Sequence, residues 1–390
     1  MGDSFIRVNI LVKDFKEVFY KGEIIMRKLA LLLGSLVVVA SASAKEVVPA
    51  PVVVEEAPVQ IVEKEVIVYR DKEEGFRPNG NVDLQYRYYG KTEGKEDEHA
   101  KGHDIKEWNE KNNASRLQLQ GKINMTENQA LEYRIREFND LDKEDYLNAG
   151  NDNTQVRLRY FYNHGNLGDS KVNFTSRVHY EDKGGSQNAQ YMARFNFAEY
   201  MFNNDFVKTT DFTIAPHYKY VWSDDNSSNY DNQLGVDLYS FYELPWGFST
   251  ELNIYADQHF YGDKAEIKVK DGDKIGKEDK NFTVSVEAYV YHTLPLYEND
   301  KLSVAFNNEG GFDTWDWSRE KEFDGERESD DTTYQVYLLS TIVVNYQATP
   351  NVTLYAAAGA EYRNWTRVEA SSTSNWRWQP TAWAGFKTTF

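Results

Sequence analysis

The sequence predicts an all-β protein, a transmembrane antiparallel up-and-down β-barrel of about fourteen strands with short periplasmic turns and long extracellular loops. Three observations predict it. From Asn79 to Phe390, segments of roughly ten residues carry apolar side chains at every second position, as a membrane-spanning strand requires. The connections between these segments alternate between short and long. Tyrosine and tryptophan gather at the segment ends, where the interface girdle of a membrane barrel lies.

Composition excludes several other classes of protein. The chain has 390 residues, no cysteine and a net charge of −18. The absence of cysteine excludes a disulfide scaffold and a cysteine-ligated metal site. The acidic balance argues against a nucleic-acid partner, because binding to the phosphate backbone needs clustered Lys and Arg. Outside one N-terminal stretch, no apolar run is long enough for a membrane helix.

The region before the barrel is interpreted as three segments. Residues 26–44 hold a basic start, a short apolar core and the sequence Ala42-Ser43-Ala44, which together are typical of a secretory signal peptide. Residues 1–25 are then a mis-called upstream extension, with translation starting at Met26. Residues 45–78 are rich in Val, Pro and Glu, and we interpret them as an extended periplasmic linker. The barrel is predicted over residues 79–390.

The predicted connections are of two kinds. Short turns rich in Pro, Asn, Asp and Gly are expected at residues 126–128, 203–205, 244–247 and 349–351. Long polar loops are expected at residues 91–113, 139–152, 181–188, 223–231, 262–280, 314–332 and 367–374. A soluble β-sandwich also alternates apolar and polar residues, but the loop alternation, the aromatic ends and the export signal favour the membrane barrel.

If the apolar positions face lipid, the alternate positions face the lumen. The predicted inward residues of the first six strands are mostly basic, with Asp83 and Glu132 as exceptions. We name this set the basic arc: Arg87, Arg116, Lys122, Arg134, Arg136, Arg157, Arg159, Arg177 and Arg194. The predicted inward residues of the later strands form the acidic arc: Asp237, Glu251, Asp257, Glu287, Glu309 and Glu361.

Two interpretations of these arcs stay open. Because strands follow one another around the wall, one arc would face the other and set a field across a water-filled lumen. The alternative is ion pairing inside the lumen that only satisfies buried charges. The predicted outer loops are rich in Asp and Glu, which favours a weak preference for cations at the mouth.

Enzymatic and metal sites are not expected. His99 and His103 lie four residues apart, but in an acidic loop rather than a clear helix. Asp224 and Asp225 could form a carboxylate pair for a rim hydrolase, yet no histidine lies beside them. Asp271 and Asp273 open like a calcium loop whose later ligand positions fail. We therefore predict neither an enzyme nor a cofactor.

Several stretches carry a resemblance to a known family. They are Met26 to Leu31, Lys45 to Pro51, Val62 to Asp71, Arg77 to Gly80 and Gln85 to Gly90. In these stretches the sequence resembles the FomA-type major outer-membrane porins of fusobacteria, and the terminal Phe390 is similar to the sorting signal of outer-membrane proteins. The resemblance implies a trimeric, voltage-gated, general-diffusion porin that also acts as an adhesin.

The predicted function is an outer-membrane porin that lets small hydrophilic solutes and ions diffuse through a charged lumen. Its partners would be outer-membrane lipid, those solutes and ions, two further copies in a homotrimer, and host or bacterial surface ligands bound through the loops. An adhesin or structural barrel without steady conductance and a substrate-specific sugar channel remain as alternatives.

Overall fold

The protein forms one closed β-barrel. The computed structural model describes residues 75–94, 112–141, 153–223, 230–268, 275–319, 321–324, 327–328, 336–364 and 376–390. Fourteen strands form the barrel, and all neighbouring pairs are antiparallel. They are β1 (Asn79–Tyr89), β2 (Ala114–Asn124), β3 (Gln129–Asp140), β4 (Asn153–Asn166), β5 (Asn173–Lys183), β6 (Ser186–Asn196), β7 (Lys208–Ser223), β8 (Tyr230–Glu243), β9 (Phe248–Lys268), β10 (Ile275–Glu298), β11 (Leu302–Ser318), β14 (Val336–Thr349), β15 (Val352–Asn364) and β16 (Trp376–Thr389).

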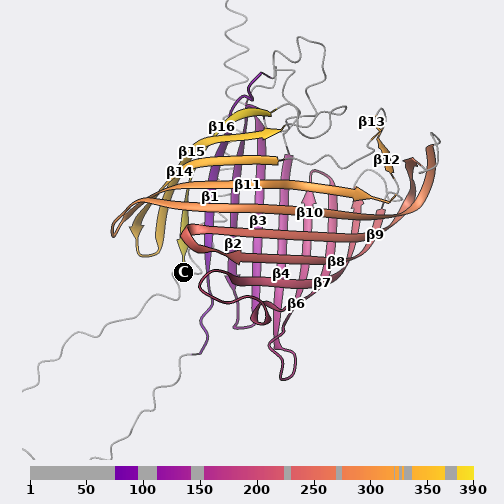
Figure 1. Cartoon of the computed structure of the whole chain (residues 1–390), viewed down its shortest axis with the longest axis horizontal. Helices are drawn as coiled ribbons and strands as arrows, with labels where there is room; N and C mark the ends of the chain where they lie inside the picture. The colour runs from indigo at the N-terminus through magenta and orange to yellow at the C-terminus, as the bar shows by residue number, and fades with distance from the viewer. Residues whose placement is uncertain are drawn as a thin grey trace, which may run out of the picture. The chain divides into compact units, whose positions relative to one another are not determined.

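The barrel closes between its first and last strands. Each strand pairs with the next one along the chain, and β1 also pairs with β16 from Asn81↔Thr389 to Tyr89↔Thr381. In Figure 1 strands β9 to β11 cross in front of β1 to β4, so that the two groups form opposite walls. This closed up-and-down arrangement confirms the predicted fold class.

Three neighbouring strands are longer than the rest. β9, β10 and β11 have 21, 24 and 17 residues, whereas a tilted strand needs only about 9–11 residues to cross a bilayer. At the end of β9 the sheet continues into two short strands, β12 (Lys321–Asp324) and β13 (Arg327–Glu328). The wall is therefore higher on this side than elsewhere.

Three of the predicted long loops differ in the structure. The predicted loops 262–280 and 314–332 are shorter, because β9 runs to Lys268, β10 begins at Ile275 and β11 runs to Ser318.

The third is a tight hairpin turn. Residues 181–188 were expected to form a long loop, but β5 and β6 stay paired up to Lys183↔Ser186 and only Gly184 and Gly185 turn between them. Both glycines have positive φ, +60° and +93°, which is the backbone that a two-residue hairpin turn requires. Polar residues occupy both faces of the strands beside this turn, since Glu181 and Lys183 alternate with Asp182, and an uninterrupted polar run looks like a loop in the sequence.

Short 3-10 helices occur only in turns among the described residues. They are η1 (Ala198–Tyr200), between β6 and β7, and η2 (Pro245–Gly247), between β8 and β9. No helix in the described part of the chain has the length and apolar character to cross a membrane.

The two faces of the sheet have opposite chemistry. One face exposes large apolar side chains, among them Leu158, Val178, Leu234, Val236, Val290 and Leu338. The other face carries charged and hydrogen-bonding side chains, and many of them are buried. They include Arg116, Gln118, Arg177, Asp237, Asn253 and Gln379. In a closed barrel the buried face is the inner one, so the interior is polar and the exterior apolar.

Candidate functional site

The inner face of the barrel holds the candidate site. Cross-strand pairs share a face of the sheet, as do alternate residues along one strand, and together these relations place every residue of the basic arc on one face of β1 to β6. Two of these pairs place arginines directly opposite each other, Arg87↔Arg116 and Arg134↔Arg157. Like charges at such positions destabilise a sheet. The stability of the barrel therefore does not explain why they are there.

The acidic arc lies on the same inner face of the other strands. Asp237 is on β8, Glu251 and Asp257 are on β9, and Glu287 is on β10. Glu309 on β11 pairs with Leu339, which in turn pairs with Glu361 on β15. The basic and acidic arcs thus occupy two different halves of the wall. The structure brings each predicted set together on one half.

The arginines are held mainly by neutral acceptors. Arg116 donates to Oε1 of Gln85 at 2.9 Å, Arg136 to Oε1 of Gln118 at 2.7 Å, and Arg177 to Oε1 of Gln190 at 2.7 Å. Each of these neutral partners accepts one hydrogen bond from a buried guanidinium group without cancelling its charge. The other such bonds are Arg87 to Thr381 at 3.0 Å and Arg159 to His179 at 3.2 Å.

The carboxylates of the acidic arc are held mainly by tyrosine hydroxyls. Tyr239 donates to Asp237 at 2.7 Å, Tyr255 to Glu287 at 2.9 Å, and Tyr291 to Glu251 at 2.9 Å. Tyr337 donates to Glu309 in the same way. A hydrogen bond from a neutral hydroxyl favours the ionised carboxylate and leaves its negative charge in place.

Ion pairs occur inside each half rather than between the arcs. Arg134 lies 3.4 Å from Glu181, and Lys122 lies 4.0 Å from Glu132. Over the ranges that the structure describes, no ion pair joins the basic arc to the acidic arc. The two sets of charges therefore remain separate.

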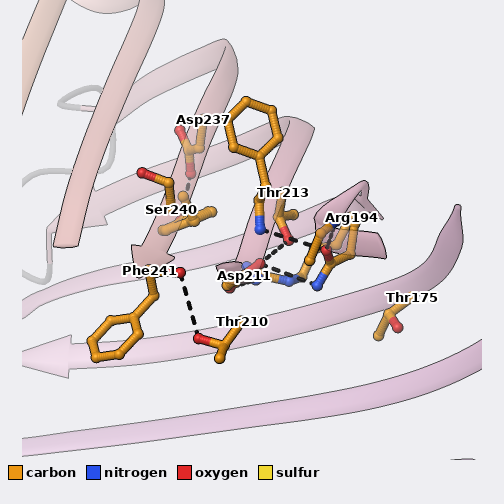
Figure 2. A network of polar contacts seen from close by, with 12 residues as sticks. Thr175, Arg194, Thr210, Asp211, Thr213, Asp237, Ser240 and Phe241 are labelled. Atoms are coloured by element: carbon orange, nitrogen blue, oxygen red, sulfur yellow. Dashed lines mark hydrogen bonds and ion pairs between the residues drawn. The ribbon is translucent and has the colours of Figure 1, made fainter. Parts of the chain in front are cut away.

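The boundary between the arcs lies at β6 to β8. Arg194 on β6 is 3.5 Å from Oδ2 of Asp211 on β7, and Asn196 and Thr213 donate hydrogen bonds to the same carboxylate. Figure 2 shows Arg194, Asp211 and Thr213 pointing toward one another on these strands. The Arg194 guanidinium also stacks 4.7 Å from the ring of Tyr239, which is a favourable cation–π contact.

Two recesses open on the inner face. One has a volume of about 480 Å³ at the turn end, between Lys122, Glu132 and Arg194. The other has a volume of about 340 Å³ and is lined by Arg159 and Arg177 on one side and by Asp237, Asp257 and Glu287 on the other. Members of both arcs thus contact the same space.

Two groups of inner-face residues lie outside the sets that the sequence predicts. Glu181 was placed in a loop, although the alternation Arg177, His179, Glu181 continues the inward series. The tyrosines that bind the acidic arc were not singled out. Tyr239 follows Asp237 by two residues and so shares its face, a signal that was available in the sequence. Tyr255 reaches Glu287 across strands, which the sequence alone does not indicate.

Several predicted features lie outside the described residues. They are the segments 1–25 and 26–44, most of the linker 45–78, the pairs His99–His103 and Asp224–Asp225, and Asp271 and Asp273.

No protein-family profile and no curated protein matches this chain. Among solved structures it is similar to a bacterial polysaccharide outer-membrane secretin, with 10% identity over 80% of this chain and 97% of the other and a TM-score of 0.35. It is also similar to the outer-membrane channel DcaP of Acinetobacter baumannii (9% identity, 80% and 96% coverage, TM-score 0.33) and to an anion-selective porin from Comamonas acidovorans (10% identity, 80% and 99% coverage, TM-score 0.31). At this level of similarity, these matches assign neither family nor function.

Proposed function

We propose that this protein is an outer-membrane porin through which small hydrophilic solutes and ions diffuse passively. The observation that carries the proposal is the separation of charge on the inner face. In the described part of the chain no ion pair joins the two arcs. Neutral side chains instead hold several members of each arc: Arg116, Arg136 and Arg177 on β2 to β5, and Asp237, Glu251 and Glu287 on β8 to β10. A wall built only to satisfy buried charges would pair them, because an unpaired charge in a dry interior is costly.

Water in the lumen accounts for this arrangement. Fourteen strands about 4.8 Å apart and tilted by about 40° enclose a backbone cylinder about 28 Å across, which inward side chains do not fill. Charges that are exposed to such a space keep their hydration on the lumen side, whereas Arg116, Arg177 and Asp237, which are at most 9% exposed, depend on their hydrogen bonds. Facing arcs of opposite charge would then orient dipolar solutes and slow apolar ones.

The outer face supports a membrane location. At the turn end, the rings of Tyr162, His164, Phe174 and Phe195 form a row with centroids 4.3 to 5.0 Å apart. Tyr162 meets His164 edge-to-face, and the other neighbours stack. At the loop end, Tyr180, Tyr220, Trp222 and Tyr230 form a second row. Exposed aliphatic side chains such as Val178 and Val236 lie between the two rows. Two aromatic rows with an apolar band between them are typical of an outer-membrane barrel.

Conductance tests the proposal. The protein is refolded from detergent into a planar lipid bilayer, and single-channel current is recorded in potassium chloride. We expect steady, stepwise conductance. A correctly folded barrel that gives no steps would overturn the proposal and leave the structural or adhesin interpretation.

A sugar-specific channel is a second candidate, favoured by the rings beside the acidic arc. On the inner face, Tyr239 and Tyr255 lie 5.8 Å apart, and Tyr291, Tyr289 and Tyr337 follow at centroid distances of 6.2 and 6.3 Å. Aromatic faces with hydrogen-bonding tips suit the alternating apolar and polar surfaces of sugars. Concentration-dependent block of the ion current by oligosaccharides would support this candidate, and unchanged current would exclude it.

The finer properties stay predictions. The sequence of residues 26–44 predicts export to the outer membrane. The family resemblance implies the homotrimer, the adhesin role and the voltage gating. Light scattering in detergent measures the oligomer. The predicted weak cation preference is tested by the reversal potential in a salt gradient.

A further inference from the structure

Three titratable side chains meet on the inner wall at β7, β8 and β9. Nε2 of His217 lies 2.8 Å from Oδ1 of Asp257, and Nδ1 lies 3.3 Å from Oδ1 of Asp237. All three line the recess of about 340 Å³. His217 and Asp237 are only 7% and 3% exposed. We name these three residues the His217 cluster.

A glycine makes room for the cluster. Gly235 on β8 is the cross-strand partner of both His217 on β7 and Asp257 on β9. A Cβ at this position would lie 2.2 Å from the Asp257 carboxylate and 2.6 Å from the imidazole of His217. The imidazole and the carboxylate therefore meet over β8 only because residue 235 has no side chain.

Hydrogen bonding fixes the state of the imidazole ring. An ionised carboxylate can only accept, so Nε2 of His217 is the donor to Asp257. In the neutral ring Nδ1 then carries a lone pair. Among the described residues, Nδ1 of His217 and Oδ1 of Asp237 have no hydrogen-bond partner, whereas Oδ2 of Asp237 accepts from Tyr239.

Two buried lone pairs 3.3 Å apart repel each other unless a cation lies between them. A proton on Nδ1 would be one such cation, but the ring is not directed so that this proton makes a hydrogen bond to Oδ1 of Asp237. The spacing instead matches neighbouring ligands of a tetrahedral metal ion, which lie about 3.4 Å apart for bonds of about 2.1 Å. A histidine ligand that donates its other N–H to a carboxylate is the usual outer arrangement of such sites.

We propose that the His217 cluster binds a divalent transition-metal ion of the zinc class in the wall of the lumen. Nδ1 of His217 and Oδ1 of Asp237 are the protein ligands, and Asp257 orients the imidazole. Imidazole with carboxylate is a donor set that suits zinc, copper and nickel. Water from the recess completes the coordination. With two protein ligands, and with Arg177 lining the same recess, binding is weaker than at a four-ligand structural site.

Equilibrium dialysis of the refolded full-length barrel against zinc chloride, at a pH above 7, tests the proposal without depending on channel activity. We compare the wild type with the near-isosteric variants Asp237→Asn and His217→Gln. Each should lose one bound zinc per chain. Cobalt replaces zinc in a second titration, where the visible absorption of a histidine–carboxylate site should vanish in both variants.

His259→Gln is the matched control. His259 is another inner-face histidine, but its Nδ1 is hydrogen-bonded to Asp231 and its Nε2 to Thr283. Its replacement should leave zinc stoichiometry unchanged. Gly235→Ala gives an independent check, since an added methyl group should weaken zinc binding at least tenfold while both ligands remain present.

Circular dichroism and the heat-dependent gel shift of folded barrels confirm that each variant is folded. Equal zinc stoichiometry in the wild type and in folded Asp237→Asn and His217→Gln would overturn the proposal. That result would make His217 an imidazolium shared between two carboxylates instead. Steady conductance with no such site would separate this failure from that of the porin function.

Discussion

At the scale of single residues, the basic arc and the acidic arc share the inner face, and in the described part of the chain no ion pair joins one arc to the other. Glutamine, threonine and tyrosine side chains bond to these charges where a dry core would need residues of opposite charge. Gln118 accepts from Arg136 in this way, and Tyr291 donates to Glu251. The sequence predicted which charged residues share a face, because alternation fixes the side of the sheet. It did not predict their partners, since contacts such as Tyr255 to Glu287 depend on register between strands 32 positions apart.

Reversal potentials test the charge arcs. Replacing Arg134, Arg136, Arg157 and Arg159 by Gln removes positive charge from the wall, so we expect permeability to shift toward cations by a factor on the order of ten, the low end of what charge-lined clefts achieve. Replacing Glu251, Glu287 and Glu309 by Gln should shift it toward anions. Lys171→Gln, in an exposed turn, is the control and should change little. A shift of the same sign in both sets would contradict the assignment.

At the scale of elements, barrel closure depends on how β16 fits between β15 and β1. Gly385 on β16 lies under Tyr355 of β15, whose hydroxyl reaches over it to hydrogen-bond Asp83 of β1. The alternation predicted that β16 and β1 are strands, but it did not predict this bridge. A glycine in a strand weakens the strand unless another group approaches closely, and here the phenol ring does.

We expect Gly385→Ala to weaken this closure. The new Cβ would lie 2.2 Å from the carbonyl oxygen of Leu84 and 2.6 Å from the Tyr355 hydroxyl, so the strands must move apart. Such overpacking costs about 1–3 kcal/mol. Urea unfolding followed by tryptophan fluorescence measures the loss. Gly75→Ala, where an added Cβ meets nothing within 4 Å, should be neutral; equal stability of the two variants would show that closure tolerates a side chain at 385.

At the scale of the whole molecule, the apolar exterior and the polar interior belong to one arrangement. A soluble barrel would reverse it and bury Leu234 and Val236, which are instead exposed. Loop length was predicted less well than strand position. Polar residues on both faces of a strand look like loop residues in the sequence, which is why the hairpin at Gly184 and Gly185 was missed.

Two leucines with similar exposure separate a membrane barrel from a soluble one. Leu234 on β8 is 55% exposed and lies four residues inside the aromatic row at Tyr230, whereas Leu167 is 43% exposed in the turn after β4. Surrounding lipid makes an arginine costly near the bilayer centre and tolerable near its edge. For vesicle-embedded protein unfolded in urea, Leu234→Arg should cost about 2–4 kcal/mol and Leu167→Arg about 0–1 kcal/mol. In water, both exposed sites would accept arginine equally, so equal costs would place β8 in solvent and remove the basis for a pore.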